Sequence, residues 1–111
     1  MKGLKNVKAY IKNVGVVTTN IGIENGKIVY IGDNGDDIEP IFETDGVVLP
    51  GFIDEHIHGA GGSDAMDGTV DALQTISEYV AREGTTGFLA TTMTQSKENI
   101  TGAKKAVKEI R

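Results

Sequence analysis

The stretch from Leu49 to Asp67, LPGFIDEHIHGAGGSDAMD, decides the fold because the sequence pattern changes across it. Before it, short runs rich in Val, Ile and Tyr are separated by turn residues, as in an all-β segment. After it, strand-like runs alternate with runs of helical period, which is typical of a parallel α/β architecture. We therefore expect two parts, an all-β part at residues 1–49 and an α/β part at residues 50–111.

The all-β part is expected to contain several short strands. Its clearest feature is a hairpin at residues 21–32, in which Asn25 and Gly26 tolerate the positive φ values of a type I′ turn. The acidic run at residues 33–37 is interpreted as a solvated turn, because it lacks the alternating ligand spacing of a calcium loop. Further strands are expected at residues 4–11, 14–18 and 46–50.

The α/β part is expected to contain two strand–helix units. In order, these are a strand at residues 52–57, a long Gly/Asp loop at 59–68, a helix at 69–84, a strand at 85–94 and a second helix after Ser96. Thr69 and Ser96 can cap the two helices, and Gly84 can supply a left-handed residue after the first. Two parallel strands cannot complete a sheet covered on both faces, and a (β/α)₈ barrel needs eight units, so the sequence stops where a third strand is expected.

Composition narrows the function classes. With 39% hydrophobic and 24% charged residues in 111, the chain is that of an ordinary soluble domain, and its formal charge of -5 disfavours nucleic acid as a partner. It has no cysteine, so a transition metal must be held by imidazole and carboxylate groups. No apolar run reaches the length of a membrane span and no signal peptide is present, so we expect a cytoplasmic protein that does not contact membrane.

The two histidines of the chain, His56 and His58, are the candidate metal ligands. In an extended strand, residues two apart share a face, so Asp54, His56 and His58 are expected to project together. A bare His-x-His pair could equally form hydrogen bonds in a polar crevice. Its position at the carboxyl end of an α/β strand favours a metal, because ligands bind at that end. A catalytic zinc or iron centre usually has three protein ligands, so others must come from elsewhere.

The residues around this pair carry weaker signals. Asp54 lies deeper in the strand and is expected to orient a metal ligand without binding the metal itself. The glycine-rich loop, with Gly61 and Gly62 as its candidate substrate contacts, could bring backbone amides to an anionic or carbonyl group, or be a flexible connection. Threonines end the second strand at the same rim and could offer hydroxyls to a substrate. Since no serine or cysteine nucleophile and no carboxylate pair is present, metal-activated water is the only hydrolytic chemistry indicated, and no catalytic residue is assigned.

Two motifs carry a family resemblance. LPGFIDEHIHGAGGSDAMD at residues 49–67, followed by REGTTGFLATTMT at residues 82–94, resembles the amidohydrolase superfamily. The PGFIDxHxH part is common to many metal-dependent amidohydrolases. The HGAGG loop and the GTTxFLATTMT strand narrow the resemblance to the N-acetylglucosamine-6-phosphate deacetylases.

The resemblance implies a fold, a reaction and a cofactor. Residues 50–111 would be the first two βα units of a (β/α)₈ TIM barrel, and residues 1–49 the N-terminal part of a small β-sandwich domain. The implied reaction is hydrolysis of N-acetylglucosamine 6-phosphate to glucosamine 6-phosphate and acetate in amino-sugar catabolism. His56 and His58 would bind one or two divalent ions, zinc or iron. The full-length family member is expected to be a homodimer.

The family's catalytic aspartate and remaining ligands would lie beyond Arg111. We therefore expect an N-terminal fragment that is inactive alone. Two alternatives stay open, another amidohydrolase such as a cyclic-amide hydrolase or deaminase, and a non-catalytic metal-binding module.

Overall fold

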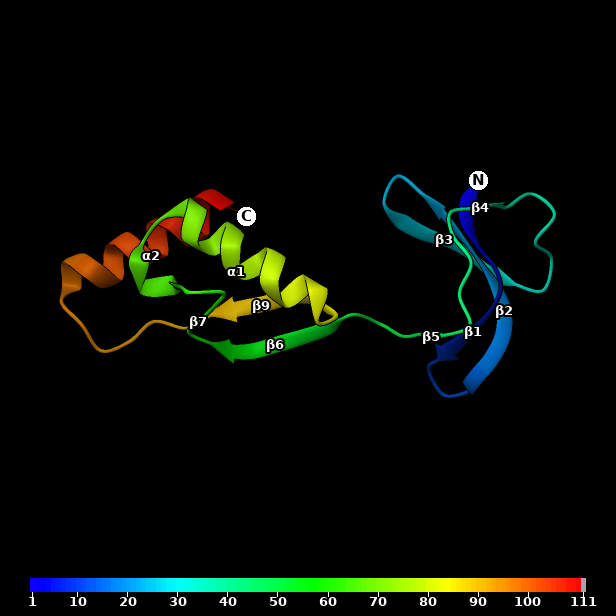
Figure 1. Ribbon diagram of the computed structural model, residues 1–111, viewed down its shortest axis with the longest axis horizontal. Helices are drawn as coiled ribbons and strands as arrows, with labels where there is room; N and C mark the ends of the chain where they lie inside the picture. The colour runs from blue at the N-terminus through cyan, green and yellow to red at the C-terminus, as the bar shows by residue number, and fades with distance from the viewer. Residues whose placement is uncertain (111) are drawn as a thin grey trace. The chain divides into compact units, whose positions relative to one another are not determined.

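The computed structural model describes residues 1–110, which divide into two compact units between Pro50 and Gly51 (Figure 1). Each unit has its own cluster of buried apolar side chains, so each is described by itself. None of the helices within residues 1–110 is long and apolar enough to cross a membrane.

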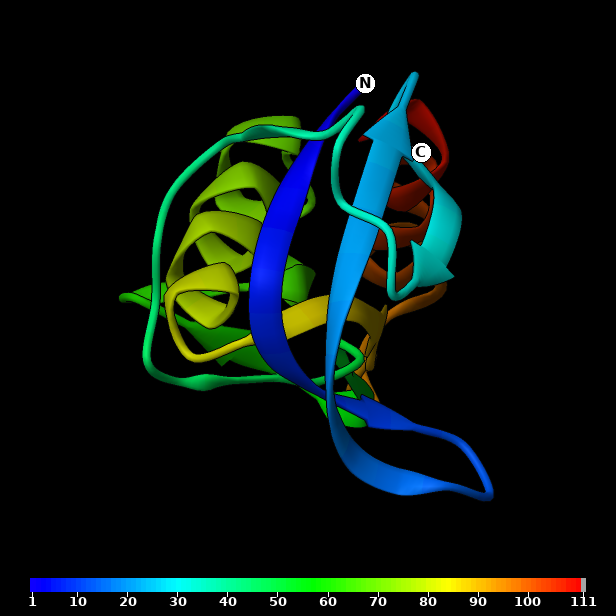
Figure 2. The same ribbon diagram turned by 90° about the vertical axis from the view of Figure 1, so that its right-hand side faces the viewer.

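The first unit is a single five-stranded sheet. Its strands are β1 (Lys2–Ile11), β2 (Gly15–Glu24), β3 (Lys27–Gly32), β4 (Glu39–Pro40) and β5 (Val47–Val48). β2 lies between β1 and β3 and is antiparallel to both, and the two short strands β4 and β5 run parallel to β1. β1 and β2 form two long, curved strands (Figure 2). A second sheet facing this one, as a β-sandwich requires, is not present in the part of the chain that the structure describes.

Buried polar side chains explain why β2 is one long strand. The predicted strand at residues 14–18 and the start of the predicted hairpin at residues 21–32 are joined through Thr19 and Asn20, which are buried. The Asn20 amide donates to the carbonyl oxygen of Gly32 at 3.0 Å, and Asn20 Oδ1 accepts from the backbone N–H of Asn6 at 2.9 Å. Because these polar groups are hydrogen-bonded, their burial carries little penalty, and the strand continues through them.

The second unit alternates strands and helices. Its elements are β6 (Phe52–Ile57), β7 (Gly59–Ala60), β8 (Ser63–Asp64), the 3₁₀ helix η1 (Ala65–Asp67), α1 (Val70–Arg82), β9 (Thr85–Ala90) and α2 (Lys97–Ile110). β6 and β9 pair in parallel, as predicted, and no further strand joins this sheet within residues 51–110. Arg111 lies outside the described residues.

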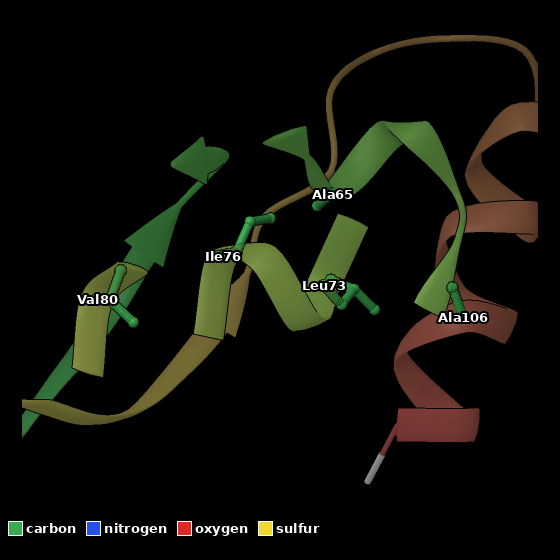
Figure 3. Packing of buried hydrophobic residues seen from close by; sticks show 5 residues of the cluster. All are labelled: Ala65, Leu73, Ile76, Val80 and Ala106. Atoms are coloured by element: carbon green, nitrogen blue, oxygen red, sulfur yellow. The ribbon is translucent and has the colours of Figure 1, made fainter. Parts of the chain in front are cut away.

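The helices cover one face of the β6–β9 sheet (Figure 1). The core beneath them consists of Ala65 from η1, Leu73, Ile76 and Val80 from α1, and Ala106 from α2 (Figure 3). No element within residues 51–110 covers the opposite face of the sheet, and Ile53 and Leu89 remain 65% and 61% exposed. Apolar side chains thus occupy both faces of the sheet, although only one face is packed.

Local capping follows the predicted pattern. Thr69 Oγ1 accepts from the backbone N–H of Ala72 at 3.1 Å at the start of α1, and Ser96 Oγ accepts from the N–H of Asn99 at 3.2 Å at the start of α2. Gly84 has a φ of 91° after the end of α1. These interactions satisfy the N–H groups that a helix leaves free at its start and turn the chain at its end.

Candidate functional site

The glycine-rich stretch after β6 is folded more tightly than the long loop that the sequence predicts. β7 and β8 form a hairpin, and its turn residues Gly61 and Gly62 have φ values of 61° and 81°. Positive φ at both turn positions is the requirement of a type I′ turn. Gly59 must also be small, because a Cβ atom there would collide with the carbonyl oxygen of Ser63. The Gly-Gly pair was the sequence signal for this hairpin, and the prediction of a long loop was wrong.

The capping box of η1 follows the hairpin directly. Asp64 Oδ1 accepts from the N–H of Met66 at 2.8 Å, and Asp67 Oδ2 accepts from the N–H of Asp64 at 3.0 Å. Ala65, at the start of η1, is 2% exposed and belongs to the core of the unit. The segment after the histidines is therefore anchored to the core and does not act as a free loop.

His58 is held on several sides. Its ring Nδ1 lies 3.0 Å from the carbonyl oxygen of Thr91, just after the end of β9. Its own carbonyl oxygen accepts from the N–H of Ala65 at 2.8 Å. The side chain is half-buried, so the ring has a defined environment, with one nitrogen engaged by the protein.

His56 has a more open environment. Its side chain is exposed, and its ring lies edge-on to that of His58, with the ring centroids 5.0 Å apart and the planes at 90°. The structure therefore brings the two predicted metal ligands together at the carboxyl end of β6.

β6 departs from the regular alternation after Asp54. Asp54 pairs with Phe88 and Ile57 pairs with Ala90, so β6 advances by three residues where β9 advances by two. This irregularity falls between Asp54 and Ile57, and the Asp54 carboxylate accepts from the backbone N–H of His56 at 3.0 Å. A bulge therefore interrupts the regular two-residue alternation of this strand after Asp54. The common projection of Asp54 with the histidines stays a prediction.

Gly61 and Gly62 are placed by the turn. A Cβ atom on Gly61 would meet the side chains of Thr75 and Tyr79 on α1, and one on Gly62 would meet nothing within 4 Å. The turn geometry thus gives both glycines a conformational reason to be present. Their contact with a substrate stays a prediction.

Thr91 is the residue at this site whose contribution the sequence analysis missed. Its side-chain hydroxyl is one of the threonine hydroxyls at the end of the second strand that could contact a substrate. In the structure this hydroxyl donates to the carbonyl of Leu89 at 3.3 Å. Its backbone makes the contact to His58. No side-chain pattern can signal a backbone carbonyl, although the parallel pairing of the two strands does predict that their carboxyl ends meet.

A zinc or iron site usually needs three protein ligands, and His56 and His58 offer two. A carbonyl oxygen can only accept, so the contact with Thr91 requires a proton on His58 Nδ1 and leaves Nε2 of the neutral ring with a lone pair. A backbone carbonyl on the other ring nitrogen is the usual partner of a metal-binding histidine. Residues 1–110 contain no cluster of three or more His, Asp and Glu side chains able to hold an ion. The pair therefore fits part of a zinc or iron site, with two ligands.

A cavity of about 680 Å³ lies away from the histidines, between α1, β9 and α2. Its walls are mainly apolar, and none of the lining residues within 1–110 is ionisable. Among the lining residues are Leu73, Val80, Phe88 and Val107. The described part of its lining offers no group for acid–base or metal chemistry.

Comparison with known proteins gives a consistent set of relatives. The chain is 42% identical over 107 residues to the N-acetylglucosamine-6-phosphate deacetylase of Bacillus subtilis, a match covering 84% of this chain and 26% of the relative. It is 40% identical over 75 residues to the N-acetylgalactosamine-6-phosphate deacetylase of Escherichia coli O157:H7, covering 63% of this chain and 20% of the relative. The chain thus spans about a quarter or less of these curated relatives. No protein-family model matches it.

A solved structure supports the same relationship. The crystal structure of N-acetylglucosamine-6-phosphate deacetylase from Thermotoga maritima superposes with a TM-score of 0.77 at 34% identity. The superposition covers 97% of this chain and 28% of that one. Nearly all of the chain therefore resembles a part of one larger enzyme.

Proposed function

We propose that this chain, which is related to the N-acetylglucosamine-6-phosphate deacetylases over part of their length, belongs to such an enzyme. In that enzyme, His56 and His58 would be ligands of the metal site. The reaction proposed for the complete enzyme is hydrolysis of N-acetylglucosamine 6-phosphate to glucosamine 6-phosphate and acetate. The observation that carries the proposal is the pair of imidazoles at the carboxyl end of β6, with Nε2 of His58 left free by the contact of Nδ1 with Thr91.

The chain's own residues prepare the site. His58 would bind through its free Nε2, and His56, 5.0 Å away between ring centroids, would supply the second imidazole. A bound divalent ion, zinc or iron, would supply Lewis-acid chemistry for amide hydrolysis. Asp54 holds the backbone of His56 and so orients the strand at the site. A third ligand and the proton-transferring group would come from other parts of the enzyme, so the 111-residue chain alone is expected to release no acetate.

The proposed setting is a (β/α)₈ barrel in which β6 and β9 are the first two strands. Parallel strands in such barrels are covered by helices outside and by packed side chains inside. The uncovered face of the β6–β9 sheet, with the exposed Ile53 and Leu89, matches the inside position, because α1 and α2 already cover the other face. In such barrels the active site lies at the carboxyl ends of the strands, which is where His56 and His58 stand. The first unit would then belong to a β-sandwich domain, and the complete enzyme is proposed to be a homodimer.

A second substrate has a specific observation in its favour. One relative, at 40% identity, is an N-acetylgalactosamine-6-phosphate deacetylase. The two sugars differ in the configuration of a single hydroxyl, and the metal chemistry would be the same for both.

A chimera tests the function and separates the substrates. Residues 1–110 would replace the matching segment of the Bacillus subtilis enzyme, and acetate release would be measured from both amino-sugar phosphates. We expect release from N-acetylglucosamine 6-phosphate, and a loss of at least about 100-fold in the His58→Ala chimera, since a metal ligand is removed. Glu55→Gln, a change at a neighbouring exposed residue, is the control. Preference for the galactosamine substrate would support the second candidate, and equal activity of the His58→Ala chimera would contradict the proposed site.

A further inference from the structure

Thr91 reaches across to β6 with both of its backbone groups. Its N–H donates to the carbonyl of Ile57 at 2.8 Å, and its carbonyl oxygen lies 3.0 Å from Nδ1 of His58. The first contact continues the parallel pairing of β6 and β9 by one step beyond Ala90. The contact with Nδ1 adds the side chain of His58 to the bonds between the two segments. Because the N–H of Thr91 is bonded to Ile57, the pairing of β6 and β9 fixes the position of the Thr91 carbonyl.

This contact selects one form of the His58 ring. A neutral imidazole carries its proton on either Nδ1 or Nε2, and the hydrogen bond made by one nitrogen decides which. Because the Thr91 carbonyl can only accept, it favours the tautomer with the proton on Nδ1. Nε2 then keeps its lone pair, the form in which a histidine binds a metal through that atom.

The backbone of His58 is fixed as well. Its carbonyl accepts from the N–H of Ala65, which lies in the core of the unit. Within residues 1–110 the ring of His56 has no comparable hydrogen bond, and the side chain is exposed, with its ring edge-on to that of His58. The two histidines are therefore unequal, with one held in place and one open to solvent.

We propose that Thr91, through its backbone carbonyl, is a positioning residue that holds His58 in the Nδ1–H tautomer and presents Nε2 for a divalent cation. The cation-binding half of this inference rests on the proposed function. The tautomer half does not, because it concerns the metal-free chain.

The ring nitrogens report the tautomer directly. The chain has only two histidines, so a ¹⁵N spectrum contains two imidazoles, and a His56→Asn variant assigns them. In the metal-free chain, at a pH where the rings are neutral, we expect His58 to have a protonated Nδ1 and a bare Nε2. A protonated Nε2, or an even mixture of tautomers, would overturn the inference.

Two substitutions at Thr91 separate its backbone from its side chain. Thr91→Val removes the hydroxyl and keeps both backbone groups. His58 should therefore keep the Nδ1–H tautomer, and the affinity for Zn²⁺ should change by no more than about twofold. Thr91→Pro removes the N–H that bonds to Ile57 and so releases the carbonyl, and it should lower Zn²⁺ affinity by about tenfold and mix the tautomers. Equal spectra and affinities for the two variants would overturn the proposal.

The outcomes separate this inference from the proposed function. If the wild-type chain shows the Nδ1–H tautomer and binds no Zn²⁺, the positioning by Thr91 is supported and the metal function fails. If the chain binds Zn²⁺ with His58 in the other tautomer, the positioning role is overturned. Should Thr91→Pro fail to fold, the wild-type spectrum decides alone.

Discussion

At the scale of single residues, His58 and His56 differ in how the protein holds them. The Nδ1 of His58 is bonded to the Thr91 carbonyl, whereas His56 is exposed. The sequence predicted that both would gather at the end of one strand, and the structure brings them together. It could not predict their inequality, because that depends on a backbone carbonyl 33 residues away in the chain.

The hydrogen bond between His58 Nδ1 and the Thr91 carbonyl can be tested by replacing His58 with Asn or with Gln, two amide side chains of different length. An Asn side chain places its nitrogen near the position of Nδ1, whereas a Gln side chain reaches toward Nε2. His58→Asn should therefore keep a donor for the Thr91 carbonyl, and His58→Gln should lose about 1 kcal/mol, the usual net contribution of one hydrogen bond. Amide hydrogen exchange at Thr91 measures this loss as roughly fivefold faster exchange in His58→Gln. Equally fast exchange in both variants would argue against the bond.

Gly62 tests the hairpin turn. It has a φ of 81° and open space around its Cα, so a substitution there meets backbone strain without a steric clash. Gly62→Ala should lower the free energy of unfolding by about 1 kcal/mol, and Gly62→Asn by less, since Asn tolerates the left-handed region better. Denaturant unfolding of the two variants provides the comparison. A neutral Gly62→Ala would indicate that the turn is not type I′.

At the scale of elements, local signals predicted the helices and the parallel strands well. Helical spacing and the Thr69 and Ser96 caps placed α1 and α2, and β6 occupies the predicted residues 52–57. The predictions of strand structure are wrong where contacts between residues far apart in the sequence determine the structure. Asn20 lies between two segments predicted as separate strands, yet its hydrogen bonds to Asn6 and Gly32 let β2 continue through it. The bulge after Asp54 has no signal of its own in the sequence.

The cap of α1 gives a prediction for an element. Thr69→Ala removes the hydroxyl that accepts from the N–H of Ala72, so it should destabilise the unit by about 1 kcal/mol. Thr75→Ala is the matched control, because the exposed Thr75 hydroxyl bonds to a carbonyl inside the helix and its loss should be nearly neutral. Thermal unfolding compares the two. Equal melting temperatures would mean that Thr69 does not act as a cap.

At the scale of the whole molecule, the uncovered face of the β6–β9 sheet is the main feature. Ile53 and Leu89 are exposed on it, and the chain spans 26% of its Bacillus subtilis relative. The sequence indicated incompleteness because two parallel strands cannot bury both faces. It could not reveal what covers the second face, since no pattern within the strands identifies the partner of an apolar face.

A lysine on this face should benefit the 111-residue chain and harm the chimera. In the 111-residue chain, Ile53→Lys should reduce aggregation, because it interrupts an exposed apolar surface. In the chimera with the Bacillus subtilis enzyme, the same change should abolish folding, because a charge would be buried inside the proposed barrel. Light scattering of the chain and the soluble yield of the chimera give the two readings. Good yield of the Ile53→Lys chimera would contradict the barrel placement.

His56 and His58 are expected to bind a divalent metal together, and equilibrium dialysis against Zn²⁺ measures this binding. The wild-type 111-residue chain should bind one ion, and His56→Ala and His58→Ala should each lose binding, while Glu55→Gln should bind as the wild type does. Equal Zn²⁺ content in the wild-type chain and in both histidine variants would contradict this expectation.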